Sequence, residues 1–152
     1  MHLRATLDDF LAAQGFRRHD LGKNRVGHFQ LVGDLEGRPI DVLVDTGAAS
    51  TVIDLAYCRD QGLPLQDTQQ RGGGAGGVGL PIYTLPGVAL SLGGVRLQSG
   101  GIYALDLSHV NEGLVAQGAG SIHAVLGADI LARHAAIVDY GASALYLRLS
   151  DA

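Results

Sequence analysis

The sequence predicts a mostly β protein whose strands form a closed or partly closed β-barrel with short helices. From residue 26 onward, short runs that alternate between apolar and polar residues recur, and glycine-containing turns separate them. Segments with helix start and stop signals are short, so helices can only flank the sheet. Apolar residues make up 47% of the 152 residues, which suits one globular domain with a packed core. Many short strands with regular turns favour a closed sheet.

The composition argues against two classes of function. The formal net charge is -4, aromatic residues make up 5% and tryptophan is absent, so neither charge nor stacking side chains favour nucleic-acid binding. No stretch approaches the roughly 18 apolar residues that a membrane span needs, and residues 1–18 lack a signal-peptide pattern. As it stands the sequence predicts a soluble, cytoplasmic protein, or a periplasmic one if a targeting segment precedes it. The single Cys58 is expected in the core.

The first 25 residues predict a short helix and a linker ahead of the main domain, which comprises residues 26–152. Residues 6–13 carry the helix signals: Thr6 can serve as N-cap, Asp8 and Asp9 suit the positive helix end, and Gly15 can end the helix. Residues 17–24 are polar, so we expect them to form the linker.

Two predicted strands lead to an acidic residue. Residues 28–35 alternate, residues 36–39 form a turn, and residues 40–44 return as a buried strand. Asp45 follows on a tight turn that Gly47 permits. A carboxylate among aliphatic residues is costly to ionise unless hydrogen bonds stabilise it. Taken alone, the pattern is typical of an Asx-turn that closes a hairpin. Beyond it, Asp54 can cap a helix over residues 55–61.

The second half of the chain predicts more short elements. Residues 88–97 form a hairpin around Gly93 and Gly94, and residues 101–105 form a strand. Ser108 can open a helix over residues 109–117. Residues 122–126 form a strand that runs into a turn at Gly127, and residues 128–132 form a short helix. Residues 136–140 and 144–149 form a closing hairpin.

Glycine dominates residues 72–79, and three interpretations compete. A phosphate-binding loop would need a lysine, serine or threonine and a following helix, whereas Pro81 follows here. A disordered linker is a second interpretation, but the segment is short and lies inside the domain. A mobile hairpin tip is the preferred interpretation, because glycine supplies hinge freedom and lets the backbone approach a ligand.

Two motifs together resemble one known family. Residues 45–48 read Asp-Thr-Gly-Ala, and Thr-Val-Ile follows at residues 51–53; downstream, residues 124–131 place an apolar pair, a glycine and a second apolar pair in order. This combination resembles retropepsin-like (retroviral-type) single-domain aspartic proteases, here as a bacterial-type member. The resemblance spans residues 26–149 and implies a retropepsin-type barrel. It also implies that the glycine-rich segment is a substrate-binding flap, built from Gly73, Gly74, Ala75, Gly76 and Gly77.

The resemblance implies an aspartic endopeptidase that needs neither cofactor nor metal. Two carboxylates share one proton about a water molecule in such enzymes. Each chain carries one Asp-Thr-Gly, so the resemblance implies a homodimer with Asp45 from each subunit and a polypeptide substrate. The active-site loop would be supported by Thr46, Gly47 and Ala48. The alternative is a catalytically silent peptide-binding or assembly module with the same fold.

Several other residues invite comparison with the family. Asp139 lies in a sequence that echoes the one around Asp45, so it could be a second carboxylate of a monomer, but a hairpin-turn acid is preferred. Ala49 and Ala128 stand where viral enzymes often place an acidic residue and an arginine that pair. Asp129 is expected to cap the following helix. The histidines show no metal-binding spacing, so His123 is expected to be an ordinary surface or hydrogen-bonded residue, and so is His134.

Overall fold

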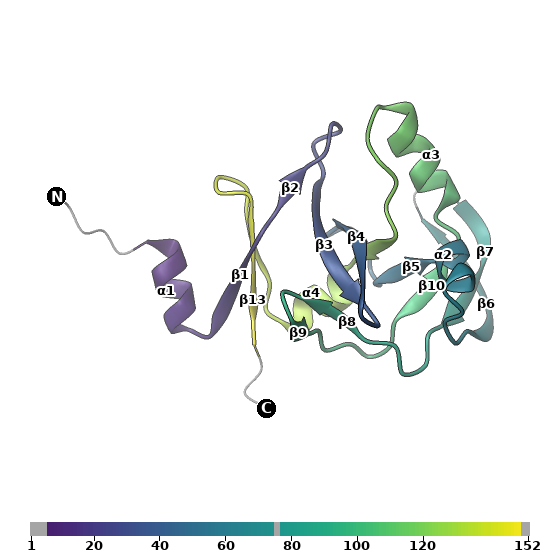
Figure 1. The fold of residues 1–152 in the computed structure, drawn as a ribbon, viewed down its shortest axis with the longest axis horizontal. Helices are drawn as coiled ribbons and strands as arrows, with labels where there is room; N and C mark the ends of the chain where they lie inside the picture. The colour runs from purple at the N-terminus through teal and green to yellow at the C-terminus, as the bar shows by residue number, and fades with distance from the viewer. Residues whose placement is uncertain (1–5, 75–76, 150–152) are drawn as a thin grey trace.

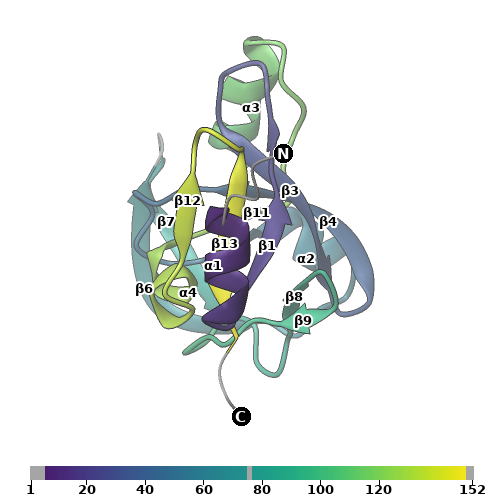
Figure 2. The ribbon, with the colours of Figure 1, turned by 90° about the vertical axis from the view of Figure 1, so that its left-hand side faces the viewer.

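The computed structural model describes residues 6–74 and 77–149, which form two β-sheets and four short helices (Figure 1). One sheet has ten strands and holds the main core. The other has three strands and lies on the side of the molecule that carries helix α1 (Figures 1 and 2). The mostly β character with short helices that the sequence predicts is confirmed. In the described part of the chain, none of the helices has the length and apolar character to cross a membrane.

The N-terminal segment begins with α1 (Leu7–Ala13), which has the predicted cap. The Thr6 hydroxyl accepts a hydrogen bond from the Asp9 N–H at 3.0 Å, and the Asp9 carboxylate accepts one from the Thr6 N–H at 3.4 Å. The predicted linker over residues 17–24 is wrong. Its residues form β1 (Phe16–Asp20), which pairs with β13 (Ala144–Arg148), and β2 (Gly22–Lys23), which pairs with β3 (Phe29–Leu35). Most of β1 faces solvent, and its polar residues conceal the strand from a hydrophobicity pattern.

The centre of the large sheet brings the two sequence motifs together. β3 (Phe29–Leu35) and β4 (Arg38–Val44) form the predicted hairpin. β5 (Val52–Asp54) and β11 (Ala124–Leu126) lie beside them in the order β5-β11-β4. β11 runs parallel to β4, with Leu126 opposite Val44, and antiparallel to β5. The ends of β4 and β11 therefore meet at one edge, where each strand passes into its motif.

The remaining strands extend the large sheet on both sides. β6 (Gln66–Gly74) and β7 (Gly77–Thr84) form a long hairpin, and β10 (Tyr103–Leu105) joins it to β5. On the other side, β8 (Leu90–Leu92) pairs with β3, and β9 (Val95–Arg96) follows across the predicted two-glycine turn. β12 (Ile137–Asp139) and β13 form the predicted closing hairpin, which belongs to the small sheet.

The predicted barrel closure is not confirmed. Among the described residues, the strand path β6-β7-β10-β5-β11-β4-β3-β8-β9 is open at both ends, and β2 pairs with β3 beside that path. The physical reason lies in the chain's last strands: β13 pairs with β1 and β12 pairs with β13 in the separate small sheet, so neither bridges the ends of the large one. The retropepsin-type barrel detail of the sequence-based expectation therefore has no support.

Three short helices flank the large sheet, and two of them differ from the sequence-based expectation in detail. α2 (Leu55–Asp60) has Asp54 at its N-cap position, but the Asp54 carboxylate accepts its hydrogen bond from the distant Leu107 N–H at 3.1 Å. α3 (Ser108–Ala116) begins at Ser108, with Leu107 as N-cap. α4 (Ala128–Arg133) follows the Gly127 turn as predicted.

Apolar side chains gather in three clusters. The main core includes Ile40, Ile53, Leu126 and Ile130, and it also contains the buried Cys58 that the sequence predicts. A second cluster lies between α3 and the central strands and consists of Leu43, Leu107, Leu114, Ile122 and Val125, with partly buried neighbours that include Ala48. A third cluster, centred on Leu11, Ala144 and Tyr146, packs α1 against the small sheet.

Candidate active site

Asp45 stands on a turn at the end of β4, as the sequence predicts. The Asp45 N–H donates to the carbonyl oxygen of Leu126 at 3.0 Å, which joins the turn to β11. The Gly47 N–H donates to Asp45 Oδ1 at 2.9 Å, and the Ala48 N–H donates to the Asp45 carbonyl at 3.2 Å. These bonds hold the carboxylate in a defined orientation. The side chain nevertheless remains exposed in a single chain.

The loop after Asp45 rests directly on the second motif. A Cβ atom at Gly127 would lie 2.6 Å from the Ser50 carbonyl oxygen and 2.8 Å from that of Ala48, so only glycine fits without moving backbone. The Ala128 N–H donates to the Ala48 carbonyl at 2.7 Å. The close approach of the Ala48 and Ser50 carbonyl oxygens to Gly127 explains why a glycine is needed at this point of the second motif.

A buried hydrogen-bond network fastens the two motifs together. Thr51 is fully buried; its hydroxyl donates to Asp129 Oδ1 at 2.7 Å and accepts from the Gly127 N–H at 3.0 Å. The Thr51 N–H lies 3.0 Å from each oxygen of the Asp129 carboxylate. The sequence-based expectation that Asp129 caps α4 is therefore wrong. Gly127 has the N-cap position, and the Asp129 carboxylate accepts hydrogen bonds from Thr51 instead. Sequence reasoning missed this link, although Thr51 belongs to the first motif.

The other predicted members of the loop lie around Asp45. Thr46 and Gly47 are exposed, whereas Ala48 is half-buried and packs against the second apolar cluster beneath α3. Ala49 is exposed and Ala128 is half-buried. The loop is thus supported both by apolar packing and by the Thr51 hydrogen-bond network.

The glycine-rich segment forms a hairpin. β6 and β7 pair antiparallel up to Gly74 opposite Gly77, so Gly73, Gly74 and Gly77 belong to the ends of these strands. The Arg71 side chain ties the two strands, because its Nε donates to the Gly79 carbonyl at 2.6 Å. Ala75 and Gly76, the two remaining predicted flap residues, lie outside the described residues.

The histidine and cysteine side chains near the motifs have structural partners. His134 is buried; its Nε2 accepts from the Gln98 N–H at 2.9 Å, and its Nδ1 lies 2.9 Å from the Arg148 carbonyl. His123 Nδ1 accepts from the Asp41 N–H at 2.9 Å. Burial raises the pKa of the Cys58 thiol to about 11, which disfavours a reactive thiolate. Across residues 6–74 and 77–149, no three His, Cys, Asp or Glu side chains are grouped as metal ligands.

Asp139 lies at a hairpin turn. It ends β12, and its Oδ1 accepts from the Ala142 N–H at 3.1 Å across the turn that leads into β13. This is the interpretation preferred from the sequence, and the hydrogen bond gives the carboxylate a local structural role.

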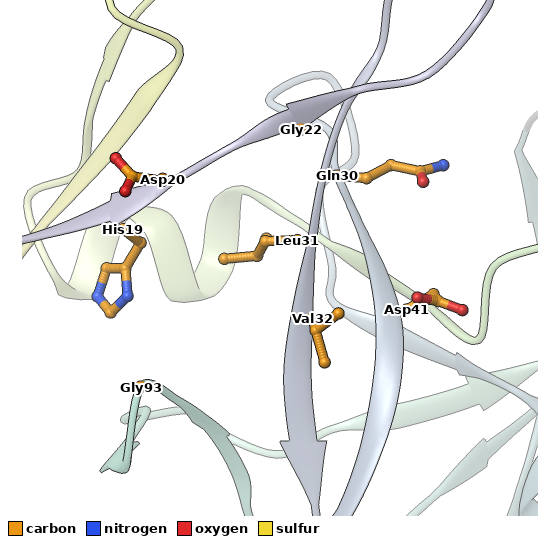
Figure 3. Close-up of a pocket in the computed structure, with 8 residues that line it drawn as sticks. All are labelled: His19, Asp20, Gly22, Gln30, Leu31, Val32, Asp41 and Gly93. Atoms are coloured by element: carbon orange, nitrogen blue, oxygen red, sulfur yellow. The ribbon is translucent and has the colours of Figure 1, made fainter.

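Two surface hollows lie elsewhere on the chain. The first, of about 490 Å³, surrounds β3; His19 and Leu31 lie on one side of the strand, and Gln30 and Asp41 on the other (Figure 3). The second, of about 550 Å³, lies beside α3. Neither hollow is lined by a residue of the loop that carries Asp45. Asp45 itself is exposed in the single chain.

A family model matches the region that contains the first motif and nearly all of the second. A family model described as aspartyl protease matches residues 31–130, which is more than half of the chain and runs from β3 into α4. The chain belongs to the aspartyl protease family. The resemblance that the two motifs indicated is therefore confirmed.

Solved structures show the same fold at low sequence identity. A retropepsin-like aspartic protease from Rickettsia conorii superposes with a TM-score of 0.56 at 19% identity, covering 87% of this chain and 90% of that one. The retroviral protease-like domain of Ddi1 from Leishmania major superposes with a TM-score of 0.53 at 15% identity, covering 78% of this chain and 86% of that domain. No curated protein matches this chain in sequence. The retropepsin-like fold is thus shared.

Proposed function

We propose that this aspartyl protease is an endopeptidase of the retropepsin-like type that acts as a homodimer. The observation that carries the proposal is that the Asp45 carboxylate is both oriented and exposed. Its carboxylate is oriented by the Gly47 N–H at 2.9 Å, yet it is exposed at the end of β4. A single chain holds one such carboxylate, whereas activation of water and protonation of the carbonyl require two groups. A two-fold axis beside Asp45 would supply the second copy.

The proposed chemistry is general acid–base catalysis on a water molecule. Two carboxylates that face one another closely cannot both ionise, so the pair holds one proton. The ionised Asp45 takes a proton from water as the water oxygen bonds to the peptide carbonyl carbon, and the protonated Asp45 of the other subunit donates to the carbonyl oxygen. Collapse of this tetrahedral species breaks the C–N bond, and the amine leaves with a proton from the pair.

The surrounding residues would have supporting roles. Thr46, Gly47 and Ala48 would hold the Asp45 turn, through backbone geometry and the packing of Ala48 against the apolar cluster. The β6–β7 hairpin would act as the flap that closes over an extended polypeptide, with Gly73, Gly74, Ala75, Gly76 and Gly77 at its end. We assign this activity to residues 26–152.

The direct test is Asp45→Asn in an assay on denatured proteins and peptides. An amide cannot take the proton from water, so kcat/KM should fall by at least about 100-fold while the circular dichroism spectrum is unchanged. Asp139→Asn is the matched control, because it removes an acid from a structural turn; it should retain activity. Equal loss in both variants, or full activity of Asp45→Asn, would contradict the proposal. Peptide binding without any cleavage by the wild-type protein would favour a silent binding module.

A further inference from the structure

The hollow beside α3 lies on the face of the large sheet that also supports the Asp45 loop. Its volume of about 550 Å³ is within the range of about 300–1,000 Å³ that is typical of ligand-binding clefts. The residues that line it are Asp54, Ser108, Asn111, Glu112, Val115, Ala116 and Ser121. Asp54 and Val52 are two positions apart on β5, so their side chains share a face. Val52 packs against the second apolar cluster, as does Ala48 of the Asp45 loop.

Helix α3 presents one side to this apolar cluster and another side to the hollow. Leu107, Val110 and Leu114 belong to the cluster. The hollow is lined by residues whose spacing places them along one stripe of the helix, at positions 108, 111, 112, 115 and 116. The Asn111 side chain fixes the helix, because its Nδ2 donates to the Ile122 carbonyl at 3.1 Å and its Oδ1 accepts from the Ile122 N–H at 2.7 Å. α3 therefore forms a fixed wall, at one end of the molecule (Figures 1 and 2).

The charged side chains that line the hollow are both carboxylates. Asp54 is half-buried; its Oδ1 accepts from the Leu107 N–H at 3.1 Å, whereas its Oδ2 has no hydrogen-bond partner among the described residues. Glu112 is exposed, and its Oε2 lies 3.8 Å from Nδ1 of His109, which carries a charge only when it is protonated. No lysine or arginine of the described chain lines the hollow. Its lining therefore favours a positively charged ligand.

The uncharged lining residues suit a long basic side chain. Val115 is 57% exposed and adjoins Ala116, so the two offer apolar surface to the methylene groups of a lysine or arginine. The hydroxyl groups of Ser108 and Ser121 can accept hydrogen bonds from an ammonium or guanidinium group. A neutral aliphatic side chain would leave both carboxylates without a partner, and an acidic side chain would be repelled.

We propose that this hollow is a subsite for a lysine or arginine side chain of the polypeptide substrate, with Asp54 and Glu112 as the residues that recognise it. The inference rests on the proposed function, in which a polypeptide lies between the Asp45 loop and the glycine-rich hairpin. In the strand order β7-β10-β5, the strand that ends at Asp54 is two places from β7 of that hairpin. The hollow thus flanks the proposed path of the polypeptide.

The first experiment is a cleavage profile on a library of peptides from a digested, denatured proteome. The wild-type protein should cleave peptides in which lysine and arginine are enriched at one position relative to the scissile bond. Glu112→Lys should remove this enrichment and favour aspartate and glutamate at the same position. Asp60→Lys is the matched control, because it makes the same change of charge at an exposed residue of α2 that does not line the hollow. It should retain the wild-type profile.

One cleaved sequence then measures the size of the preference. Norleucine in place of the preferred basic residue keeps an aliphatic side chain and removes the charge, so kcat/KM of the wild-type protein should fall about five- to tenfold. In a variant that combines Asp54→Asn with Glu112→Gln, the same replacement should cost less than about twofold. Asparagine retains an acceptor for the Leu107 N–H, so the fold should be unchanged by circular dichroism. Added salt should weaken the wild-type preference.

The subsite and the proposed function fail in different ways. Cleavage by the wild-type protein without enrichment of basic residues, or enrichment that persists in Glu112→Lys, would refute the subsite and leave the peptidase intact. An absence of cleavage by the wild-type protein would refute the proposed function and the subsite with it. Binding by the Asp45→Asn protein gives a readout without catalysis: fluorescence anisotropy should show tighter binding of the peptide with the basic residue than of the norleucine peptide. Equal affinities would overturn the subsite.

Discussion

Thr51 and Asp129 are 78 positions apart in the chain, yet three hydrogen-bond contacts join them beneath the loop that carries Asp45. The Thr51 hydroxyl also accepts from the Gly127 N–H, so one buried side chain links both motifs. The carboxylate of Asp129 receives a further hydrogen bond from the Ile130 N–H at 2.8 Å. This arrangement holds the start of β5 against the start of α4 and so determines where the Asp45 loop lies.

Removal of the Thr51 hydroxyl should destabilise the protein. Thr51→Val leaves the buried Gly127 N–H without an acceptor and removes a donor from Asp129, so the free energy of unfolding should fall by about 1–3 kcal/mol. Thr51→Ser retains the hydroxyl and should recover most of this loss. Thr84→Val is the control, because the exposed Thr84 hydroxyl makes one contact at 3.5 Å. Urea unfolding measures all three; equal effects at Thr51 and Thr84 would contradict the role of the network.

A methyl group at Gly127 should disrupt the contact between the motifs. The backbone of Gly127 has φ −106° and ψ −177°, which alanine adopts without strain, so the cost of Gly127→Ala comes from its contacts with the backbone of Ala48 and Ser50. We expect a loss of about 3 kcal/mol, because backbone must move to make room. Gly120→Ala is the control, since a Cβ there meets nothing within 4 Å.

Thermal unfolding and peptide cleavage test this substitution together. If Gly127→Ala unfolds at the wild-type temperature and cleaves peptides at the wild-type rate, the close approach of the two motifs has no consequence for the Asp45 loop.

Acid should destabilise the protein through His19. Burial, followed by the charge of Arg17, lowers the pKa of His19 below its ordinary value. The unfolded chain then binds a proton near the ordinary histidine value of about 6.5, before the folded chain does. This contribution to stability is therefore complete above that pH and is lost as the pH falls from it toward the lower pKa of the folded state.

Replacement of His19 should flatten this dependence. Urea midpoints of His19→Gln, measured from about pH 7.5 to about pH 5, should fall less steeply than those of the wild-type protein. His109→Gln is the control, because His109 is exposed on α3. An unchanged slope in His19→Gln would show that another group governs acid destabilisation.

The glycine-rich hairpin should respond to a bound peptide. Glycine has the largest backbone entropy, so amides at residues 72–74 and 77–79 should exchange rapidly in the free protein. A peptide-like aspartic protease inhibitor should slow this exchange, because closure of the hairpin would pair its backbone with the ligand. Amides of the β8–β9 hairpin provide an internal reference. Strong and equal protection with and without inhibitor would indicate a rigid structural hairpin.

Local patterns were sufficient to predict most of the elements. The capping residues Thr6 and Asp9 lie three positions apart and interact within one helix turn, so the start of α1 could be predicted from neighbours alone. The β8–β9 hairpin has the same local origin, since Gly93 and Gly94 both adopt positive φ angles that the turn requires. The strand before Asp45 was evident because its apolar residues are contiguous.

Elements that depend on distant partners could not be predicted in this way. β1 is largely polar, and it becomes a strand because β13 offers it a free edge. The carboxylate of Asp54 was expected to cap α2, but it accepts a hydrogen bond from the distant Leu107 N–H instead. Barrel closure likewise depended on where β12 and β13 would pair.

The sequence by itself determined the strand that ends at Asp45, the turn that follows it, and each of the two motifs that indicate the family, because each depends on residues that are close in the chain. The tertiary structure alone decided that Asp129 binds Thr51 and that Gly127 lies against the Ser50 carbonyl. These relationships join residues from separate strands and helices. Their energies arise from contacts that exist only after the sheets have assembled, so no local pattern in the chain encodes them.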